Sequence, residues 1–366
     1  MIDAKRQYWH SHPSTVVLIR ATSHRIAISR TMRGIWWSIG ILDGRYRPSP
    51  HVSRNGALPY MTAQVLRGAG LSGRLRAEIE IAIAQLLAAG GQHPTLATVL
   101  VGADPSALAY RASIERTLSR VAIAHQPIDL PLTIERDMFC QEINRLSEDP
   151  LVTGVMVLMP LPHHLPQSLV YEHLSPLKDV DGITPVNAGR MHMGLPSLRP
   201  STPQGGLELL DHYGVEIEGR MVVVVGRSNV VGRPLASLML QRHATVMICH
   251  RRTVDLASKT RMADILCVAA GHADLITVDM VKPGAVVLDF GVNAVDGGIT
   301  GDVAFDQVSG VARAVTPVPG GTGPVTALVL ARNTVAAGYA SLAGNLDAVN
   351  ELNRVIQALA PRDTSG

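Results

Sequence analysis

After the first sixty residues, short apolar runs alternate with amphipathic segments along the chain. Residues 70–91 carry the apolar spacing of a helix that ends at two glycines, and residues 95–102 form an apolar run typical of a buried strand. A second helix is predicted to begin at Asp104, which suits an N-cap, followed by Pro105 at the first helical position. Residues 152–162 predict another buried strand. This alternation of strand and helix implies a parallel sheet.

A second series of strands follows a long stretch without regular periodicity, residues 178–205, which is rich in glycine and proline. Loops of this length inside a compact protein are commonly functional or lie between domains. The later strands alternate with helices, of which the first ends near Arg242, and this order predicts a doubly wound nucleotide-binding domain. The apolar runs that predict its strands are residues 221–226, 245–250, 263–270 and 285–292.

The composition excludes several classes of protein. A length of 366 residues suits about two domains of roughly 150 residues each, and a hydrophobic share of 46% is enough for a sizeable core. The 33 basic and 30 acidic residues nearly balance, which gives no reason to expect binding to nucleic acid or to a membrane. No apolar run reaches the roughly 18 residues that a membrane span needs. Three irregularly spaced cysteines fit a reducing compartment and argue against a disulfide framework.

Residues 1–60 differ from the rest of the chain, since they hold nine basic residues and two acidic ones. Their arginine-rich, acid-poor character resembles a transit peptide. Two other interpretations are a disordered extension and translated sequence upstream of a start near Met61. Only four of the 33 basic residues in the whole chain are lysines. Such a bias often reflects genome composition, and it favours a bacterial cytoplasmic protein.

A glycine loop joins a buried strand to a helix within residues 222–240. Gly226 permits a tight turn at the strand end, and the amides at the helix start then face a pyrophosphate, aided by the helix dipole. The spacing G-x-S-x-x-x-G-x-P, which ends with Gly232 and Pro234, differs from the usual G-x-G-x-x-G fingerprint. The alternative is therefore a tight turn in an α/β domain that binds no nucleotide.

The end of the next strand distinguishes between the two nicotinamide dinucleotides. The strand ends in His250, Arg251 and Arg252, where an NAD-binding unit carries an acid for the ribose 2′-hydroxyl. Basic side chains at this point suit a 2′-phosphate, with Arg227 as a second contact, and they favour NADP over NAD. The alternative is that these arginines are solvated surface charges.

Nine segments between about Met61 and Gly338 share their order and near spacing with one enzyme family, and together they resemble the bifunctional methylenetetrahydrofolate dehydrogenase/methenyltetrahydrofolate cyclohydrolases. These segments are VGADPSALAY, GVMVLMPLP, KDVDGITPVNAGRM, RPSTPQG, VVVGRSNVVGRPLASLML, ATVMICHRRT, VLDFGVN, GDVAF and TPVPGGTGPVT. The resemblance implies a two-domain α/β fold. Its parts are a folate-binding catalytic domain at 61–200, a Rossmann-like NAD(P)-binding domain at 201–324, and a C-terminal helix at about 325–360 that packs back on the first domain.

The resemblance also implies an activity. The family oxidises 5,10-methylenetetrahydrofolate to the methenyl cation with hydride passing to NADP or NAD, and most members then hydrolyse the cation to 10-formyltetrahydrofolate. A member would be a cytoplasmic oxidoreductase of one-carbon metabolism, usually a homodimer. No metal is expected, because the histidines show no metal-ligand spacing such as H-E-x-x-H. Cys249 and Cys267 lie on predicted buried strands and are expected to be core thiols.

The resemblance assigns site residues one at a time. Tyr110 matches the tyrosine that packs on the folate and helps to activate it, and Asp181 matches the aspartate that hydrogen-bonds the pterin ring. Pro319, Gly320 and Gly321 match the loop that lines the substrate. Arg251 stands where the family often has a serine that contacts the 2′-phosphate. The expected cofactor contacts are Thr202, Gly226, Arg227, Ser228, Gly232, Arg251, Arg252, Val292 and Thr326.

Two further substitutions depart from the family pattern. The lysine of its Y-x-x-x-K motif, which handles protons for the hydrolysis, is Ile114 here, and the glutamine that pairs with this lysine is Leu158. Residues i and i+4 share a helix face, so Tyr110 and Ile114 are both expected to point at the substrate. We therefore expect a dehydrogenase with weak or lost cyclohydrolase activity. The alternative is a catalytically silent or repurposed folate- or pterin-binding homologue that acts on a modified one-carbon substrate.

Overall fold

The computed structural model describes residues 7–9, 14–21, 24–31, 38–42, 63–296, 298–352 and 354. Residues 1–59 and 60–366 form two separate units. In the first unit, four strands pair antiparallel in chain order: β1 (Gln7–Trp9), β2 (Ser14–Ala21), β3 (His24–Thr31) and β4 (Ser38–Leu42). Apart from these strands, the predictions made for residues 1–60 lie outside the described residues.

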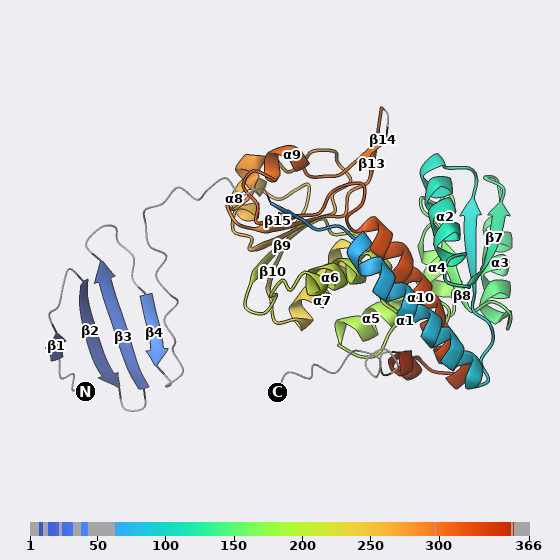
Figure 1. The fold of residues 1–366 in the computed structure, drawn as a ribbon, viewed down its shortest axis with the longest axis horizontal. Helices are drawn as coiled ribbons and strands as arrows, with labels where there is room; N and C mark the ends of the chain where they lie inside the picture. Colours follow the sequence, from blue (N-terminus) through green and yellow to red (C-terminus); the bar gives the residue numbers. More distant parts are fainter. Residues whose placement is uncertain are drawn as a thin grey trace. The chain divides into compact units, whose positions relative to one another are not determined.

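The second unit contains two lobes, each built on a parallel sheet (Figure 1). The sheet of the first lobe has the order β7-β6-β8, with β6 (Thr95–Val101) between β7 (Ala124–Leu130) and β8 (Gly154–Val157). Alternate residues of β6 face opposite sides, as the pleat of a strand requires. Ala97, Val99 and Val101 join the core beneath α3 (Arg136–Glu148) and α4 (Ser168–His173), whereas Leu96 and Leu100 join the core that includes α2 (Pro105–Leu118).

The second lobe has a six-stranded parallel sheet, ordered β10-β9-β11-β12-β15-β5. Four of its strands occupy the predicted runs: β9 (Met221–Val225), β10 (Thr245–Cys249), β11 (Ile265–Val268) and β12 (Val286–Asp289). Beyond β12 lie β15 (Ala314–Val315) and the edge strand β5 (Gln64–Val65), which pair in parallel. Residues 64–65, which the sequence placed with the first domain, thus complete the sheet of the second lobe.

The helix α10 (Gly323–Ala343) connects the two lobes, because it packs against α1 (Ala69–Ala88), α2, α6 (Ser201–His212) and β8. Nearly every side chain from Val325 to Ala340 is buried. Polar contacts add to this packing. The Tyr339 hydroxyl donates to the Ala82 carbonyl of α1 at 3.0 Å, and the half-buried Arg332 forms ion pairs with Glu78 of α1 and Glu208 of α6. The core therefore continues from one lobe into the other.

The prediction that residues 178–205 are irregular throughout is wrong, because α5 (Pro185–His192) forms within the stretch and α6 begins near its end. A start signal was present, since the Thr184 hydroxyl caps α5 by accepting from the Asn187 amide and Pro185 fills the first helical position. The remaining elements are α7 (Gly232–Gln241), α8 (Leu256–Thr260), α9 (Phe305–Val308), β13 (Asn293–Val295), β14 (Gly298–Thr300) and the 3-10 turns Val278–Met280 and Leu346–Ala348.

Within the described part of the chain, no helix combines the length and the apolar character that crossing a membrane requires.

Candidate active site

Helix α2 carries the first group of predicted site residues. It begins as the sequence predicts, with Asp104 Oδ1 accepting from the Ala107 amide at 2.9 Å. Tyr110 and Ile114 follow one turn apart, and Leu158 lies just beyond the end of β8. Ile114 and Leu158 are each only 1% exposed and belong to the same hydrophobic cluster, against which the half-buried Tyr110 packs. The two departures from the family motif therefore place apolar carbon where the family motif carries a lysine and a glutamine.

A polar group stands beside this apolar cluster. The Ser201 hydroxyl, at the start of α6, donates to Asp181 Oδ1 at 3.3 Å. Burial, and after it the charge of the nearby Asp179 carboxylate, raise the pKa of Asp181, whereas hydrogen bonds from Ser201 lower it, and together these effects bring the pKa to about 7. Burial and the charge of Asp181 also raise the pKa of Tyr110, while a hydrogen bond with Ser201 opposes this shift. Asp181 can therefore exchange a proton near neutral pH.

The two acids of the KDVDG segment have different roles in the structure. Asp179 is fully buried, and its carboxylate accepts hydrogen bonds from the amides of Ile183 (3.0 Å) and Thr184 (2.8 Å) and from the Asn187 side chain (2.9 Å). These bonds hold the segment between α4 and α5, so Asp179 is a structural residue. The hydroxyl of Ser201 is the side-chain donor to Asp181 in the described residues, which leaves Asp181 with capacity for a ligand.

Two positioning residues near Asp181 were missed by the sequence analysis. Ser201 is 1% exposed and precedes the predicted Thr202, which is half-buried. Asn333 of α10 donates to the carbonyls of Val180 (2.8 Å), which directly precedes Asp181, and of Arg199 (2.7 Å), two residues before Ser201. An asparagine in a mostly apolar helix was the available signal, because an amide that such a helix buries needs partners.

The dinucleotide loop after β9 requires two of its glycines. Gly226 has φ +132°, and a Cβ there would lie 2.2 Å from the Ala269 carbonyl oxygen. A Cβ on Gly232 would lie 2.2 Å from the Gly226 carbonyl oxygen, so the turn closes tightly onto the start of α7. The Ser228 hydroxyl accepts from the amides of Val231 (3.1 Å) and Gly232 (3.4 Å) and holds the turn in shape. This tight turn, which has no Cβ at Gly226 or at Gly232, fits a pyrophosphate at the helix start.

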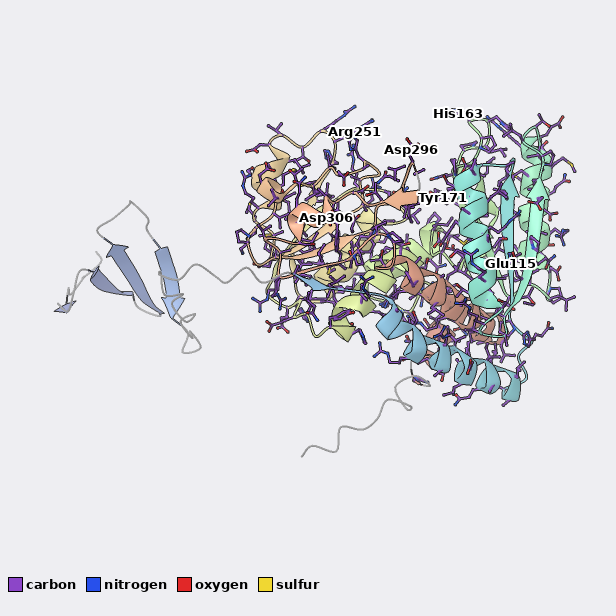
Figure 2. The ribbon with its side chains drawn as sticks, turned by 45° about the horizontal axis from the view of Figure 1, so that its top comes forward. Glu115, His163, Tyr171, Arg251, Asp296 and Asp306 are labelled. Carbon is purple, nitrogen blue, oxygen red and sulfur yellow. The ribbon has the colours of Figure 1, made fainter. Side chains whose placement is uncertain are left out.

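The predicted 2′-phosphate contacts lie around this loop at the surface. Arg227, Arg251 and Arg252 are exposed, and Figure 2 shows Arg251 at the exterior of the second lobe. The Arg252 amide donates to His250 Nδ1 at 3.2 Å, and the His250 amide donates to the Thr253 hydroxyl at 2.8 Å, so the turn after β10 is hydrogen-bonded. The three guanidinium groups thus stand on ordered backbone with their charged ends in solvent.

The other predicted contacts fall on three loops or helix starts of the second lobe. Val292 is 69% exposed at the carboxyl end of β12. Pro319 is exposed, and the Gly320 carbonyl accepts from the Gly68 amide at 3.0 Å, which joins this loop to the start of α1. Thr326 is buried, and its hydroxyl donates to the Thr322 carbonyl within α10 at 3.2 Å, so a cofactor contact through that hydroxyl remains a prediction.

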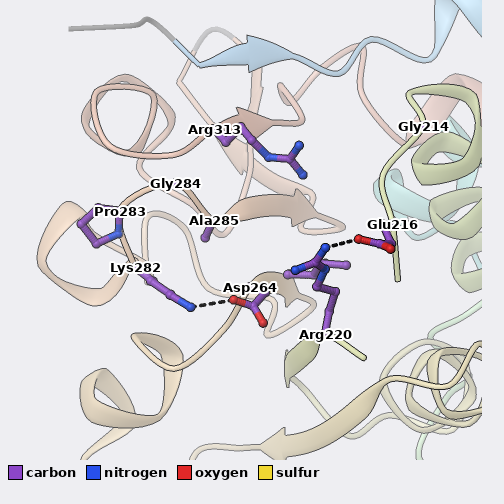
Figure 3. A pocket seen from close by; sticks show the side chains of 10 residues that line it. Gly214, Glu216, Arg220, Asp264, Lys282, Pro283, Gly284, Ala285 and Arg313 are labelled. Atoms are coloured by element: carbon purple, nitrogen blue, oxygen red, sulfur yellow. Dashed lines mark hydrogen bonds and ion pairs between the residues drawn. The ribbon is translucent and has the colours of Figure 1, made fainter. Parts of the chain in front are cut away.

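A different cavity, of about 470 Å³, opens at the amino ends of the strands of the six-stranded sheet (Figure 3). Its cations are partly neutralised, since Lys282 pairs with Asp264 at 2.6 Å and Arg220 pairs with Glu216. Ligands of open α/β sheets bind at the carboxyl ends of the strands, where the loops after β9, β10 and β12 lie. The cavity is therefore on the opposite edge from the candidate dinucleotide site.

The cysteines and the metal-ligating side chains add no further chemistry within the described residues. Burial raises the pKa of the Cys267 thiol to about 12 and also raises the pKa of the Cys249 thiol, so both side chains are core thiols, as expected from the sequence. Among the residues that the structure describes, no group of three or more histidine, cysteine, aspartate or glutamate side chains is placed to hold a metal ion.

Comparison with known proteins gives consistent matches for both lobes. The profile of the tetrahydrofolate dehydrogenase/cyclohydrolase catalytic domain matches residues 66–181, and that of the NAD(P)-binding domain of the same family matches residues 200–341. The chain is 48% identical to the bifunctional protein FolD of Chloroflexus aurantiacus over 278 residues, which cover 76% of this chain and 98% of the relative.

Solved structures of two relatives match 75% and 76% of this chain. The bifunctional FolD methylenetetrahydrofolate dehydrogenase/cyclohydrolase of Campylobacter jejuni matches with a TM-score of 0.72 and 39% identity, over 75% of this chain and 98% of that chain. The Trypanosoma brucei methylenetetrahydrofolate dehydrogenase-cyclohydrolase, solved with NADP and an inhibitor, matches with a TM-score of 0.72 and 32% identity, over 76% and 98% of the two chains.

The raised pKa of Asp181 predicts a pH-dependent effect of Asp181→Asn. A carboxyl group whose pKa rises from 3.8 to about 7 on folding lowers stability progressively as pH rises between those values. The asparagine does not titrate, so the variant should gain about 2 kcal/mol relative to the wild type between pH 5 and pH 8. Urea denaturation at both pH values measures this, with the exposed Asp129→Asn as control. A pH-independent difference between Asp181→Asn and the wild type would contradict the prediction.

Proposed function

Because the chain belongs to the tetrahydrofolate dehydrogenase/cyclohydrolase family, we propose that it oxidises 5,10-methylenetetrahydrofolate to the methenyl cation, with NADP as hydride acceptor. The observation that carries the proposal is the intact dinucleotide cradle of Gly226, Ser228 and Gly232 in one unit with the polar group of Tyr110, Asp181 and Ser201. In this assignment the first lobe holds the folate and the second lobe holds the cofactor.

The chemistry of the oxidation explains why an apolar pair is compatible with it. The methylene carbon of the substrate gives up a hydride, and the resulting positive charge spreads onto the two nitrogens that flank it, so no proton has to be removed. Bound NADP supplies the hydride acceptor. The protein mainly has to position the donor carbon, with Tyr110 packing on the folate and Asp181 binding the pterin ring.

The second reaction of the family has a different requirement. Hydrolysis of the methenyl cation adds water, and it needs a group that accepts and returns protons next to the reacting carbon. Ile114 and Leu158 offer no such group, and both are 1% exposed. We therefore propose that cyclohydrolase activity is weak or lost. A silent or repurposed folate-binding protein is the second candidate, and the same two apolar positions favour it.

The proposal also covers the cofactor, the oligomeric state and the cellular location of the enzyme. Arg227, Arg251 and Arg252 supply positive charge for a 2′-phosphate, which supports NADP over NAD. We also propose a homodimer in the cytoplasm, as the family resemblance implies. The FolD relatives span nearly the same length as the second unit of this chain, from which we propose that this unit alone carries the activity.

The proposed oxidation predicts that the purified protein forms NADPH from NADP when 5,10-methylenetetrahydrofolate is added. The measurement is absorbance at the NADPH band, with NAD in parallel and with the substrate omitted as control. Tight binding of the folate without any NADPH formation would instead support the silent folate-binding protein.

The apolar pair predicts a gain of hydrolysis on restoring the family residues. Wild-type protein should hydrolyse methenyltetrahydrofolate no faster than buffer, and Ile114→Lys combined with Leu158→Gln should raise the rate about 10-fold or more, because positioned acid–base groups commonly contribute about 100-fold or more. The decay of methenyl absorbance reports the rate. Each single variant is the matched control, since either leaves one buried polar group without its partner. Rapid hydrolysis by the wild type would refute the proposal.

The arginines after β10 predict a cofactor-specific loss of affinity. Replacing Arg251 and Arg252 by serine should raise the KM for NADP about 10-fold to 100-fold, because losing even one charged hydrogen bond costs about 1.5–3 kcal/mol. The KM for NAD should hardly change. Arg261→Ser is the control, since this exposed guanidinium donates to the Asp279 carbonyl instead. Equal losses for both dinucleotides would show that the arginines do not read the 2′-phosphate.

A further inference from the structure

Two buried carboxylates, Asp289 and Asp302, lie among the loops at the carboxyl ends of the strands in the second lobe. Asp302 is completely buried. Its Oδ2 accepts from the amides of Ala270 (2.6 Å) and Gly271 (2.9 Å), and its Oδ1 accepts from the amide of His272 (2.9 Å). One carboxylate therefore fixes three consecutive amides of the loop after β11, residues 269–272.

This loop bears directly on the dinucleotide turn. The Ala269 carbonyl oxygen lies 2.2 Å from the position that a Cβ on Gly226 would take, so the two backbones are in close contact. Asp302 Oδ1 also accepts from the Asn293 side chain at 2.9 Å, next to the predicted cofactor contact Val292. Asp302 thus holds two of the backbone segments that surround the cofactor site.

Asp289 joins this arrangement to a third segment. Its carboxylate accepts from the amides of Gly291 (2.8 Å), Asp302 (3.1 Å) and Val303 (2.9 Å). Its own amide donates to the Thr316 hydroxyl at 2.7 Å, and its carbonyl accepts from the Thr322 hydroxyl at 3.2 Å. These two threonines flank Pro319, Gly320 and Gly321, the loop predicted to line the substrate.

The close fit of the two carboxylates requires the glycines beside them. A Cβ on Gly291 would lie 2.3 Å from Asp302 Oδ1, and a Cβ on Gly301 would lie 1.9 Å from Asp289 Oδ2. In residues 63–296 and 298–352, neither carboxylate forms an ion pair with a basic side chain, so their stabilisation comes from these backbone amides and the Asn293 amide. A buried carboxylate held in this way can hardly move, because losing even one of its hydrogen-bond donors would leave part of its charge buried without a partner, which is unfavourable.

From these contacts we propose that Asp289 and Asp302 are positioning residues that hold the cofactor-side loop 269–272 and the substrate-side loop 316–322 in one fixed arrangement. This proposal rests on the proposed function, from which it takes its two ligands, NADP and a folate. Neither carboxylate contacts the reacting atoms. Their role is to make the geometry of one binding loop depend on the other, so that the donor carbon and the hydride acceptor meet at a fixed distance.

The test measures binding of each ligand alone, by titration calorimetry with NADP and with the stable folate 5-formyltetrahydrofolate. Asp302→Asn alters the cofactor side of the network, and Thr322→Val alters its substrate side. Each variant should weaken both ligands by about 5-fold or more, because the two loops share one support. Thr334→Val, which removes a buried hydroxyl that donates to the Leu330 carbonyl within α10, and the exposed Asp306→Asn are the matched controls and should change neither.

The deciding measurement is the effect of each variant on the ligand of the opposite side, that is, of Asp302→Asn on the folate and of Thr322→Val on NADP. If Asp302→Asn weakens NADP alone and Thr322→Val weakens the folate alone, the loops are independent and the proposal is wrong. Unchanged binding of both ligands overturns it equally. Thermal unfolding monitors folding, and Asn293→Ala, which removes one donor to Asp302, replaces Asp302→Asn if the latter does not fold. The binding readout needs no turnover, so a wild type that binds both ligands without forming NADPH would refute the proposed function and still decide this proposal.

Discussion

The burial of α10 between the two lobes is the constraint on which the rest of the second unit depends. A helix that is apolar on nearly every face must be surrounded by protein, and α10 is covered by α1, α2, α6 and β8. The few polar side chains that it carries are therefore forced to find partners. Asn333 and Arg332 do so by binding the backbone beside Asp181 and the carboxylates of α1 and α6.

The same principle of satisfied polar groups shapes both halves of the proposed site. The carboxylates of Asp179 on the folate side and Asp302 on the cofactor side accept hydrogen bonds from backbone amides. These bonds fix loops that have no regular secondary structure. Asp181 differs, because it is half-buried and the hydrogen bond from Ser201 leaves part of its carboxylate available to a ligand. A carboxyl group with these surroundings is suited to binding a polar ring and not to holding the fold.

In the proposed function, the apolar pair changes the balance between the two reactions of the family. Hydride transfer requires that the donor carbon be positioned, a role that the proposal gives to Tyr110 and to the loops of the second lobe. Hydrolysis requires a group that carries protons, and Ile114 and Leu158 stand in place of the lysine and glutamine that the family motif has for this step. Replacing both polar partners together avoids leaving one buried without a hydrogen bond, a cost of about 1–3 kcal/mol. The pair therefore fits a site adapted to the redox step alone.

The sequence by itself determined the α/β class, the strands β6, β8, β9, β10, β11 and β12, the Asp104 cap and the glycine turn at Gly226, because these follow from local periodicity and backbone sterics. It also located Ile114 and Leu158 as departures from a family motif. Only the tertiary structure decided that residues 64–65 complete the second sheet, that Ser201 and Asn333 serve Asp181, and that Asp289 and Asp302 interlock. These contacts join residues far apart along the chain, and no local pattern specifies which distant amide or hydroxyl a buried polar group will meet.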